Sequence, residues 1–580
     1  MGQISLQPEP GMSEPVGDDP RAAAVRALIA GDAALALQLA RLARATVGDT
    51  LEVLYCEAAA LIACGDPEGE TALQNLRTSH AVIAMKAVEI DIPRLLEDST
   101  YAHGVGASLY NGKVMGPAAL ALGRAAANPA SAAHAGLLQA QALHAEGRIE
   151  DALQVFLARY FAAPSPALHS FILYCLVFLP DGTRRHAEAA RNWARDWADP
   201  HTPSRPIHAV ERHGDRPLRV GYVAPSFTRN QTRQFVTPVF EGHAPEAVEL
   251  FTYVDDAGLE LEAIGAAKLR SLGGLDAEAA ADLVREDRID ILVDVWGHAA
   301  GHRLDLFARK PAPVQVSWLN YTQTTGLRAM DYVLHGDFMD APGKADLFSE
   351  TVLETLGPVT GLFRPHPAAR TSPAPALRTG YVTFASFNHP AKLSPESLAA
   401  WAAILRRAPT ARLVFRYAAF ADPGLQAQIQ TRFLAAGVDP DRLSFAGHAT
   451  GRDYEAAYAE IDVALDPSPC PGGTTTLEAF SRGVPVLTLD SDDYYARIGV
   501  QPMMALGLPQ LVARNWDDYV ERACALAADP EGLACLRAEI RPRFDASPYR
   551  QEHQFVRRLE AVYRGLFDRW LTESAAQEAG

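Results

Sequence analysis

The segment CPGGTTTLEAFSRGVPVLTLDS (residues 470–491) combines residue types that could hold a phosphate group. Gly472 and Gly473 would let the backbone approach a ligand closely, and three threonines then begin a helix-like run. The free N–H groups and the dipole of a helix start favour an anion, and the hydroxyls of Thr474 and Thr475 can add donors. Taken alone, the segment fits a phosphate site and a plain strand–loop–helix connection equally well.

An acidic residue, Glu478, follows about one turn into the same run. A carboxylate at that position could accept hydrogen bonds from the two hydroxyls of a ribose. The preceding VALDPSP is typical of a buried strand that ends at about residue 466, and Gly483 is placed to end the helix. The segment therefore predicts a strand, a loop and a helix that together could hold a nucleotide.

The elements that would position this segment are strand-like runs alternating with helical runs. The first set is LRVGYVAPS, VELFTYVDD, IDILVDVWG, VQVSWLNY and DYVLHGD, and the second is YVTFASFNH, ARLVFRYA, RLSFAGH, VALDPSP and PVLTLDS. Such alternation predicts two Rossmann-like lobes, over 218–375 and 376–548, with a ligand cleft at the carboxyl ends of their strands. A strongly amphipathic stretch predicts a C-terminal return helix over 549–572.

The N-terminal third of the chain lacks strand signals. Residues 20–198 are rich in Ala and Leu with helical periodicity, and glycines recur at spacings of 34, 47 and 35 residues: Gly31, Gly65, Gly112 and Gly147. We predict a tetratricopeptide-like helical domain there, the alternative being a non-repetitive Ala-rich bundle; either would present a binding surface. Residues 1–19 are predicted to be disordered, and 199–217 to form a linker.

Composition narrows the classes of function. The net charge of −17 argues against general nucleic-acid binding, which needs clustered Lys and Arg. The six cysteines form no CxxC pair and no zinc-like spacing, as expected of free thiols in a reducing compartment. The N-terminus lacks a signal-peptide pattern, and no apolar run reaches the length of a membrane span. These features predict a cytoplasmic protein that binds neither nucleic acid nor membrane.

Several blocks of sequence, in a fixed order, resemble the O-GlcNAc transferase/SPINDLY group, glycosyltransferase family 41. The blocks are RVGYVAPSFTRN, IDILVDVWGHAAGHRLDLFARKPAPVQVSWLNYTQTTG, MDYVLHGD, FNHPAKLSPESLAAWAAILRRAP and LDPSPCPGGTTTLEAFSRGVPVLTL followed by YYARIG. The resemblance extends over residues 217 to about 572. It implies tetratricopeptide repeats followed by a GT-B fold, in which two Rossmann-like domains face a cleft.

The resemblance also assigns roles to residues of the second lobe. Lys392 matches the lysine that neutralises the leaving diphosphate, and a fixed cation there would make a metal unnecessary. Thr474 and Thr475 match the helix start that binds the diphosphate, and Glu478 matches the acidic residue that holds the ribose. The resemblance therefore implies an inverting transferase with no metal site and no cofactor other than its nucleotide-sugar substrate.

Three further positions have weaker assignments. Tyr454 falls where the family has a histidine that stacks on the base, and it could equally be a core aromatic residue. His389 falls where the family has a glutamine near the phosphates. His298 lies in the loop GHAAGHRLDLF and is a candidate acceptor-side catalytic residue, the alternative being an ordinary loop histidine.

Departures from the family pattern cluster near the sugar and acceptor. Ser226 and Asn230 in SFTRNQT replace an acid and a histidine, and Asn cannot accept a proton at neutral pH. In NYTQTTG the residues Asn320, Thr322 and Gln323 replace two glycines and a proline near the donor sugar, which makes Asn320 and Gln323 candidate sugar-binding residues. Gly473 replaces the histidine that precedes the helix-start threonines.

The resemblance implies a protein O-glycosyltransferase. It gives UDP-GlcNAc as the default donor, and a Ser or Thr of an acceptor protein held by the helical repeats would be the acceptor. One alternative is a flagellin glycosyltransferase that uses a CMP-linked nonulosonic acid of the pseudaminic or legionaminic type, since the altered residues surround the sugar. An alternative of another class is a catalytically silent scaffold.

Overall fold

The structure is a computed structural model of the whole chain. It describes residues 33–47, 98–111, 115–128, 131–212, 216–228, 232–255, 267–340, 343–447 and 451–579, together with a few single positions. Its contacts divide into two compact units, one within residues 1–155 and 419–435 and the other within 156–418 and 436–580. The segment 1–19, predicted to be disordered, lies outside the described residues.

The first unit is helical where the structure describes it. Helix α10 continues across its boundary, α7 packs on α8 and α8 on α9, and α2 contacts α18. A tight turn at Gly147, with a φ of 80°, joins α9 to α10, as a helix pair requires. Gly31, Gly65 and Gly112 lie outside the described residues, so the tetratricopeptide-like period stays a prediction. The helices are α2 (Ala33–Val47), α7 (Ser99–Asn111), α8 (Met115–Ala126), α9 (Ala132–Ala145), α10 (Ile149–Ala162) and α18 (Pro423–Ala435).

The first lobe of the second unit has a seven-stranded parallel sheet with the order β3-β2-β1-β4-β5-β6-β7. Val220 of β1 pairs with Leu250 of β2 and Ile291 of β4, and all three are buried. Such continuous apolar strands are typical of parallel sheets covered on both faces. The strands are β1 (Leu218–Val223), β2 (Val248–Val254), β3 (Lys268–Ser271), β4 (Ile291–Asp294), β5 (Val314–Trp318), β6 (Tyr332–His335) and β7 (Thr351–Glu354); the helices are α13 (Arg233–Gly242), α14 (Ala277–Glu286) and α15 (Leu304–Ala308).

The second lobe has a six-stranded parallel sheet with the order β10-β9-β8-β11-β12-β13. Its centre repeats that of the first sheet, because β8 and β11 neighbour each other as β1 and β4 do. The strands are β8 (Thr383–Ser386), β9 (Arg412–Arg416), β10 (Leu443–Ala446), β11 (Val463–Leu465), β12 (Val486–Leu489) and β13 (Val512–Ala513); the helices are α16 (Ala376–Thr379), α17 (Pro395–Arg407), α19 (Gly451–Ala459), α20 (Thr474–Ser481), α21 (Arg497–Ala505), α22 (Trp516–Ala528) and α23 (Pro530–Ala546).

Helices α11 (Pro166–Leu176) and α12 (Gly182–Trp193) share a core with the first sheet. Trp193 is buried there with Leu292 and Phe307, and its indole N–H donates to the carbonyl of Pro166 at 2.9 Å. These helices therefore belong to the same compact unit as the two sheets, although the sequence groups them with the N-terminal helical region.

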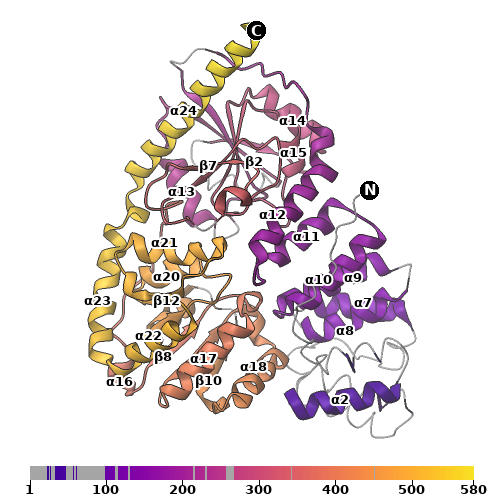
Figure 1. The fold of residues 1–580 in the computed structure, drawn as a ribbon, viewed down its shortest axis with the longest axis vertical. Helices are drawn as coiled ribbons and strands as arrows, with labels where there is room; N and C mark the ends of the chain where they lie inside the picture. Colours follow the sequence, from indigo (N-terminus) through magenta and orange to yellow (C-terminus); the bar gives the residue numbers. More distant parts are fainter. Residues whose placement is uncertain are drawn as a thin grey trace. The chain divides into compact units, whose positions relative to one another are not determined.

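Helix α24 (Glu552–Ala579) returns from the second lobe to the first, as Figure 1 shows. The hydroxyls of Tyr563 and Tyr222 are 3.1 Å apart, and Nδ1 of His243 lies 3.1 Å from a carboxylate oxygen of Glu560. These two contacts attach the helix to the core of the first lobe. The predicted fold class, a helical region followed by two Rossmann-like domains in a GT-B arrangement, is confirmed.

Candidate functional site

A cavity of about 230 Å³ lies between the two lobes, at the carboxyl ends of their strands. The first lobe contributes polar side chains that include Asn320 and Thr322, and the second contributes Lys392 and the loop before α20. The full lining is Thr232, Phe235, Leu319, Asn320, Thr322, Met339, Thr360, Gly361, Lys392, Pro471, Gly473, Thr474, Leu477, Tyr495, Ile498, Gln501, Pro502 and Tyr549. The cavity therefore opens where open α/β sheets hold their ligands.

The start of α20 faces this cavity and no side chain caps it. Gly473 is the N-cap residue and, like Thr474, lines the cavity. The hydroxyl of Thr475 donates to the side-chain oxygen of Asn388 at 3.2 Å, so it does not satisfy the backbone of its own helix. An uncapped helix start directs N–H groups and the positive end of the helix dipole at the cavity. This geometry suits an anionic ligand.

The loop that leads into α20 is held by Asp466, which directly follows β11. One of its carboxylate oxygens accepts from the N–H of Gly472 at 2.9 Å, and the hydroxyl of Thr476 donates to the Gly472 carbonyl at 3.0 Å. A Cβ at Gly472 would lie 2.5 Å from the hydroxyl oxygen of Thr475 and 2.7 Å from Asp466. Glycine is therefore required at 472 for this loop to close.

Burial raises the pKa of Asp466 from 3.8 to about 7, although the Gly472 N–H and the charge of Lys392 act in the opposite direction. Lys392 ends the short 3-10 turn Pro390–Lys392 after β8, and its Nζ donates to the carbonyl oxygen of Pro471 at 2.7 Å. The lysine thus lies beside the loop that leads into α20. A cation and a helix start together can hold a diphosphate.

Glu478 lies at the side of the cleft, and its carboxylate accepts hydrogen bonds from side chains of both lobes. The hydroxyl of Tyr454 donates to one carboxylate oxygen, and the side-chain amide of Gln234 in α13 donates to the other at 3.2 Å. Tyr454 also packs against the core, with its ring edge-on to Tyr458 at 5.4 Å between centroids. Both carboxylate oxygens of Glu478 thus already accept a hydrogen bond, and the contact of Glu478 with a ribose and the stacking of a base on Tyr454 stay predictions.

The segment NYTQTTG divides between the cavity and the core. Asn320 is exposed and Thr322 lines the cavity at 8% exposure, where its hydroxyl has no hydrogen-bond partner among the described residues. Gln323 is 2% exposed, and its amide donates to the Thr183 hydroxyl of α12 at 3.3 Å. Asn320 and Thr322 could therefore contact a ligand, whereas Gln323 instead joins α12 to the first lobe.

His298 lies outside the cavity, in a buried chain of hydrogen bonds under α11. Its Nε2 lies 2.8 Å from the carbonyl oxygen of Thr325 and must donate to it, because a carbonyl only accepts. Its Nδ1 then accepts from the hydroxyl of Ser170 at 3.3 Å, and Nε2 of His302 lies 2.9 Å from that hydroxyl. Burial lowers the pKa of His298 well below 6.5. The structure thus contradicts the prediction of a catalytic His298: both ring nitrogens are occupied and the side chain is 1% exposed.

Two other predicted positions add little to the site. Nδ1 of His389 accepts from the N–H of Ala391 at 3.0 Å, and the ring lies edge-on to Tyr417; His389 does not line the cavity. The side-chain oxygen of Ser226 accepts from the N–H of Thr228 at 3.3 Å. Asn230 lies outside the described residues. The contact of His389 with a phosphate stays a prediction.

Sequence reasoning missed three residues of the site: Asp466, Gln234 and Thr232. Asp466 had a usable signal, since an acidic residue directly after a buried strand and before a glycine loop commonly receives backbone N–H groups. Gln234 and Thr232 had none, because their place in the cleft depends on how the first lobe packs against the second.

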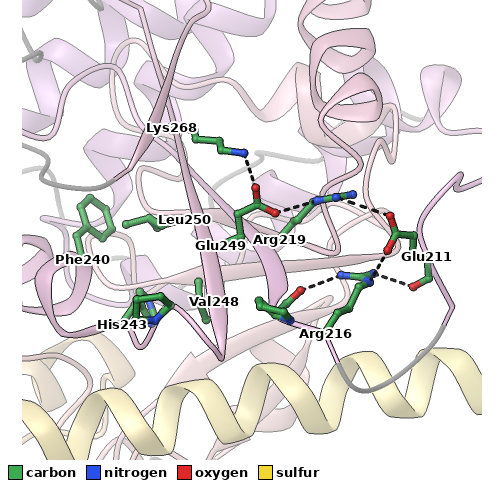
Figure 2. A pocket seen from close by; sticks show the side chains of 11 residues that line it. Glu211, Arg216, Arg219, Phe240, His243, Val248, Glu249, Leu250 and Lys268 are labelled. Carbon is green, nitrogen blue, oxygen red and sulfur yellow. Dashed lines mark hydrogen bonds and ion pairs between the residues drawn. The ribbon is translucent and has the colours of Figure 1, made fainter.

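A larger hollow of about 460 Å³ lies at the opposite edge of the first sheet, where β1, β2 and β3 begin (Figure 2). Its charged side chains pair with one another. Arg219 donates to Glu249 at 3.0 Å, Lys268 binds the other oxygen of the same carboxylate, and Arg216 binds the buried Asp290 through two hydrogen bonds. These pairs leave no unbalanced cation comparable with Lys392 at the inter-lobe cavity.

No group of three or more His, Cys, Asp and Glu side chains in the described part of the chain could hold a metal ion. No helix in that part combines the length and the apolar character needed to cross a membrane.

Comparisons with known proteins agree on one family. The sequence model described as "Glycosyl transferase family 41" matches residues 200–354 and 371–559. A tomato (Solanum lycopersicum) protein named as a probable UDP-N-acetylglucosamine–peptide N-acetylglucosaminyltransferase SPINDLY is 32% identical over 409 residues, which is 69% of this chain and 44% of that protein. Its Arabidopsis thaliana counterpart of the same name is 32% identical over 61% of this chain and 40% of its own length. The chain thus spans less than half the length of these plant relatives.

A solved structure gives a fuller match. A mutant of the Thermobaculum terrenum O-GlcNAc transferase is 29% identical, with a TM-score of 0.77 over 96% of this chain and 99% of its own. The predicted resemblance to the O-GlcNAc transferase/SPINDLY group is confirmed. The family's sequence model matches more than half of the residues of this chain, which therefore belongs to glycosyl transferase family 41.

Proposed function

We propose that the protein is an inverting, metal-independent glycosyltransferase that moves a sugar from a nucleotide donor to a Ser or Thr hydroxyl of an acceptor protein. The observation that carries this proposal is the place of Lys392, whose Nζ lies 2.7 Å from the Pro471 carbonyl beside the uncapped start of α20. A leaving diphosphate gains negative charge as its bond to the sugar breaks. A cation and a helix start fixed at that point stabilise the charge without reorganising.

The chemistry follows from these groups. The acceptor hydroxyl forms a bond to the anomeric carbon and gives its proton to water, while the bond from that carbon to the phosphate oxygen breaks and its electron pair leaves with the phosphate. Lys392 and the N–H groups at Thr474 and Thr475 receive the departing phosphate, and Glu478 holds the ribose hydroxyls. His298 takes no part, because both of its ring nitrogens are occupied.

UDP-GlcNAc is the default donor, in keeping with the names of the relatives. A CMP-linked nonulosonic acid is the second candidate. It is favoured by the buried hydroxyl of Thr322, which has no partner among the described residues, and by the polar Asn320 beside it in the cavity lining. We further propose a cytoplasmic protein whose N-terminal helices hold the acceptor polypeptide, with flagellin as the acceptor for the second donor.

Replacing Lys392 tests the function. Donor binding is first measured as a thermal shift with UDP, UDP-GlcNAc and CMP, and turnover is then followed with a radiolabelled form of the sugar donor whose nucleotide binds. We expect Lys392→Ala to lower kcat/KM about 100- to 1,000-fold, as loss of one charge-stabilising group does. Lys268→Ala is the matched control, because Lys268 lies at the opposite edge of the first sheet.

The outcomes separate the alternatives. Stabilisation by CMP and not by UDP excludes the default donor. Failure of every nucleotide to bind, or transfer that Lys392→Ala leaves unchanged, contradicts the proposed function. Nucleotide binding without any transfer would leave the scaffold alternative.

A further inference from the structure

Glu478 lies at the cleft, yet no cation among the described residues forms an ion pair with its carboxylate. The nearest guanidinium, that of Arg482, is committed elsewhere: it binds both carboxylate oxygens of Glu455 and lies over the ring of Tyr458. Arg482 reaches only the backbone carbonyl of Glu478, at 2.9 Å. The carboxylate of Glu478 is therefore held by two neutral donors, the hydroxyl of Tyr454 and the amide of Gln234.

The two donors come from different lobes. Tyr454 lies in α19 of the second lobe, the lobe that carries Glu478 itself, and its ring is packed against the core. Gln234 lies in α13 of the first lobe, between Thr232 and Phe235, and reaches across the cleft. Thr232 and Phe235 line the cavity, so the Gln234 contact forms at its edge.

A ribose offers the same chemistry that these two side chains supply. Its 2′- and 3′-hydroxyls are adjacent neutral donors, and a carboxylate can accept from both at once. We propose that Gln234 is a positioning residue that occupies Glu478 in the empty protein and is displaced by one ribose hydroxyl when the nucleotide binds. This inference rests on the proposed function and assigns to it a residue that sets nucleotide affinity.

Gln234 is the donor that leaves, because its side chain is only half-buried and its amide is 3.2 Å from the carboxylate oxygen. A glutamine also has several rotatable bonds, so release returns conformational freedom to it. Tyr454 stays, since it is enclosed by Tyr458 and Arg482. Because Gln234 and the ribose compete for one oxygen, the contact weakens nucleotide binding and favours release of the nucleotide product.

Calorimetric titration of the full chain with UDP, and with CMP in parallel, tests the inference. We expect Gln234→Ala to bind the nucleotide about three- to tenfold more tightly, because one hydrogen bond to a charged group no longer has to be broken. Gln234→Leu keeps the bulk of the side chain and should show the same gain. The 2′,3′-dideoxy forms of the same nucleotides should bind wild type and variant equally, since they cannot replace the amide.

The results distinguish this inference from the proposed function. If the wild-type protein binds neither nucleotide, the proposed function fails and the inference fails with it. If the wild type binds a nucleotide but Gln234→Ala binds it equally or more weakly at an unchanged melting temperature, only the competition by Gln234 is overturned. A gain that persists with the dideoxy nucleotides overturns it as well, because the ribose hydroxyls would then not be the competitors.

Discussion

The two Rossmann-like lobes carry a buried aspartate at the same place in their sheets. Asp294 ends β4 and Asp466 follows β11, and these strands hold equivalent positions beside β1 and β8. Both carboxylates accept from the loop that follows: Asp294 from the N–H groups of Trp296 and Gly297 at 3.2 and 2.9 Å, and Asp466 from that of Gly472 at 2.9 Å. Burial raises the pKa of each from 3.8 to about 7.

The loops differ in what lies over them. In the first lobe α11 and α12 bury the loop: His298 contacts Ser170 of α11, and its ring lies edge-on to Trp193 of α12. In the second lobe the loop borders the cavity, with Lys392 on its Pro471 carbonyl and an eight-residue helix, α20, after it. The strand and the aspartate therefore build a loop, and the elements that cover or expose that loop decide whether it can bind a ligand.

The largest effect is expected from His298 in the covered loop. His298→Ala removes a buried ring and its hydrogen bonds to Thr325 and Ser170, and should lower the free energy of unfolding by about 2–4 kcal/mol. The folded variant should keep its kcat, because His298 does not touch the cavity. Urea denaturation measures the first quantity, and sugar transfer well below the melting temperature measures the second. A large fall in kcat at unchanged stability would restore the catalytic role predicted from the sequence.

The contrast between these loops also explains what the sequence could reveal. The central strands of both sheets and α20 were predictable, since continuous apolar strands, the GG pair and the threonine run are local signals that the tertiary structure does not override. The edge strands β3, β7 and β13 were not predicted, because β3 and β7 are partly exposed and β13 has only two residues. His298 was misassigned because a loop histidine after a strand has the same local pattern whether it faces a cleft or a covering helix. The cover comes from α11, more than 100 residues earlier in the chain, as the Ser170–His298 contact shows.

The site was predictable only where one lobe builds it. Lys392, Gly473 and Thr474 were found from their own segments, and all three line the cavity. Gln323 was misassigned since alternate residues of its segment face opposite ways, Thr322 to the cavity and Gln323 to α12. The cross-cleft partner of Glu478 could not be found, because no single-sequence pattern reports the distance between two lobes.

In the open loop, the two neighbouring glycines should respond differently to the same change. A methyl group at Gly472 would meet Asp466, Thr475 and Thr476 within 2.7 Å, so the loop must shift away from its place beside Lys392. At Gly473 the nearest atom is 3.8 Å away, in Ile498, which is ordinary contact. We expect Gly472→Ala to weaken UDP binding about tenfold, or about 1.4 kcal/mol, and Gly473→Ala to have a smaller effect. Calorimetric titration measures the UDP affinity of both variants. Equal losses of affinity would contradict the role of the hydrogen bond from the Gly472 N–H to the Asp466 carboxylate.

The two aspartates should give the same stability trend with pH. A carboxyl whose pKa is raised by folding binds its proton more tightly in the folded state, so each lowers stability as pH rises from about 4 to 7. Asp294→Asn and Asp466→Asn should each flatten this slope in urea denaturation. The aspartates should differ only in nucleotide binding, since Asp466 alone lies near Lys392.

The smallest expected effect is a pH dependence of UDP affinity that Asp466 produces and Asp294 does not. Between pH 8 and about 6.5 Asp466 gains a proton, while the terminal phosphate of UDP, with a pKa near 6, stays mostly ionised. Loss of a negative charge beside Lys392 leaves the cavity more favourable to an anion, so UDP affinity should rise a few-fold as pH falls through 7. Asp466→Asn should remove the rise, because its amide oxygen can still accept from Gly472 but no longer titrates. Asp294→Asn should leave the rise in UDP affinity intact, because that carboxylate faces a loop covered by α11 and α12. A rise that survives in Asp466→Asn and disappears in Asp294→Asn would reverse the assignment of the two loops.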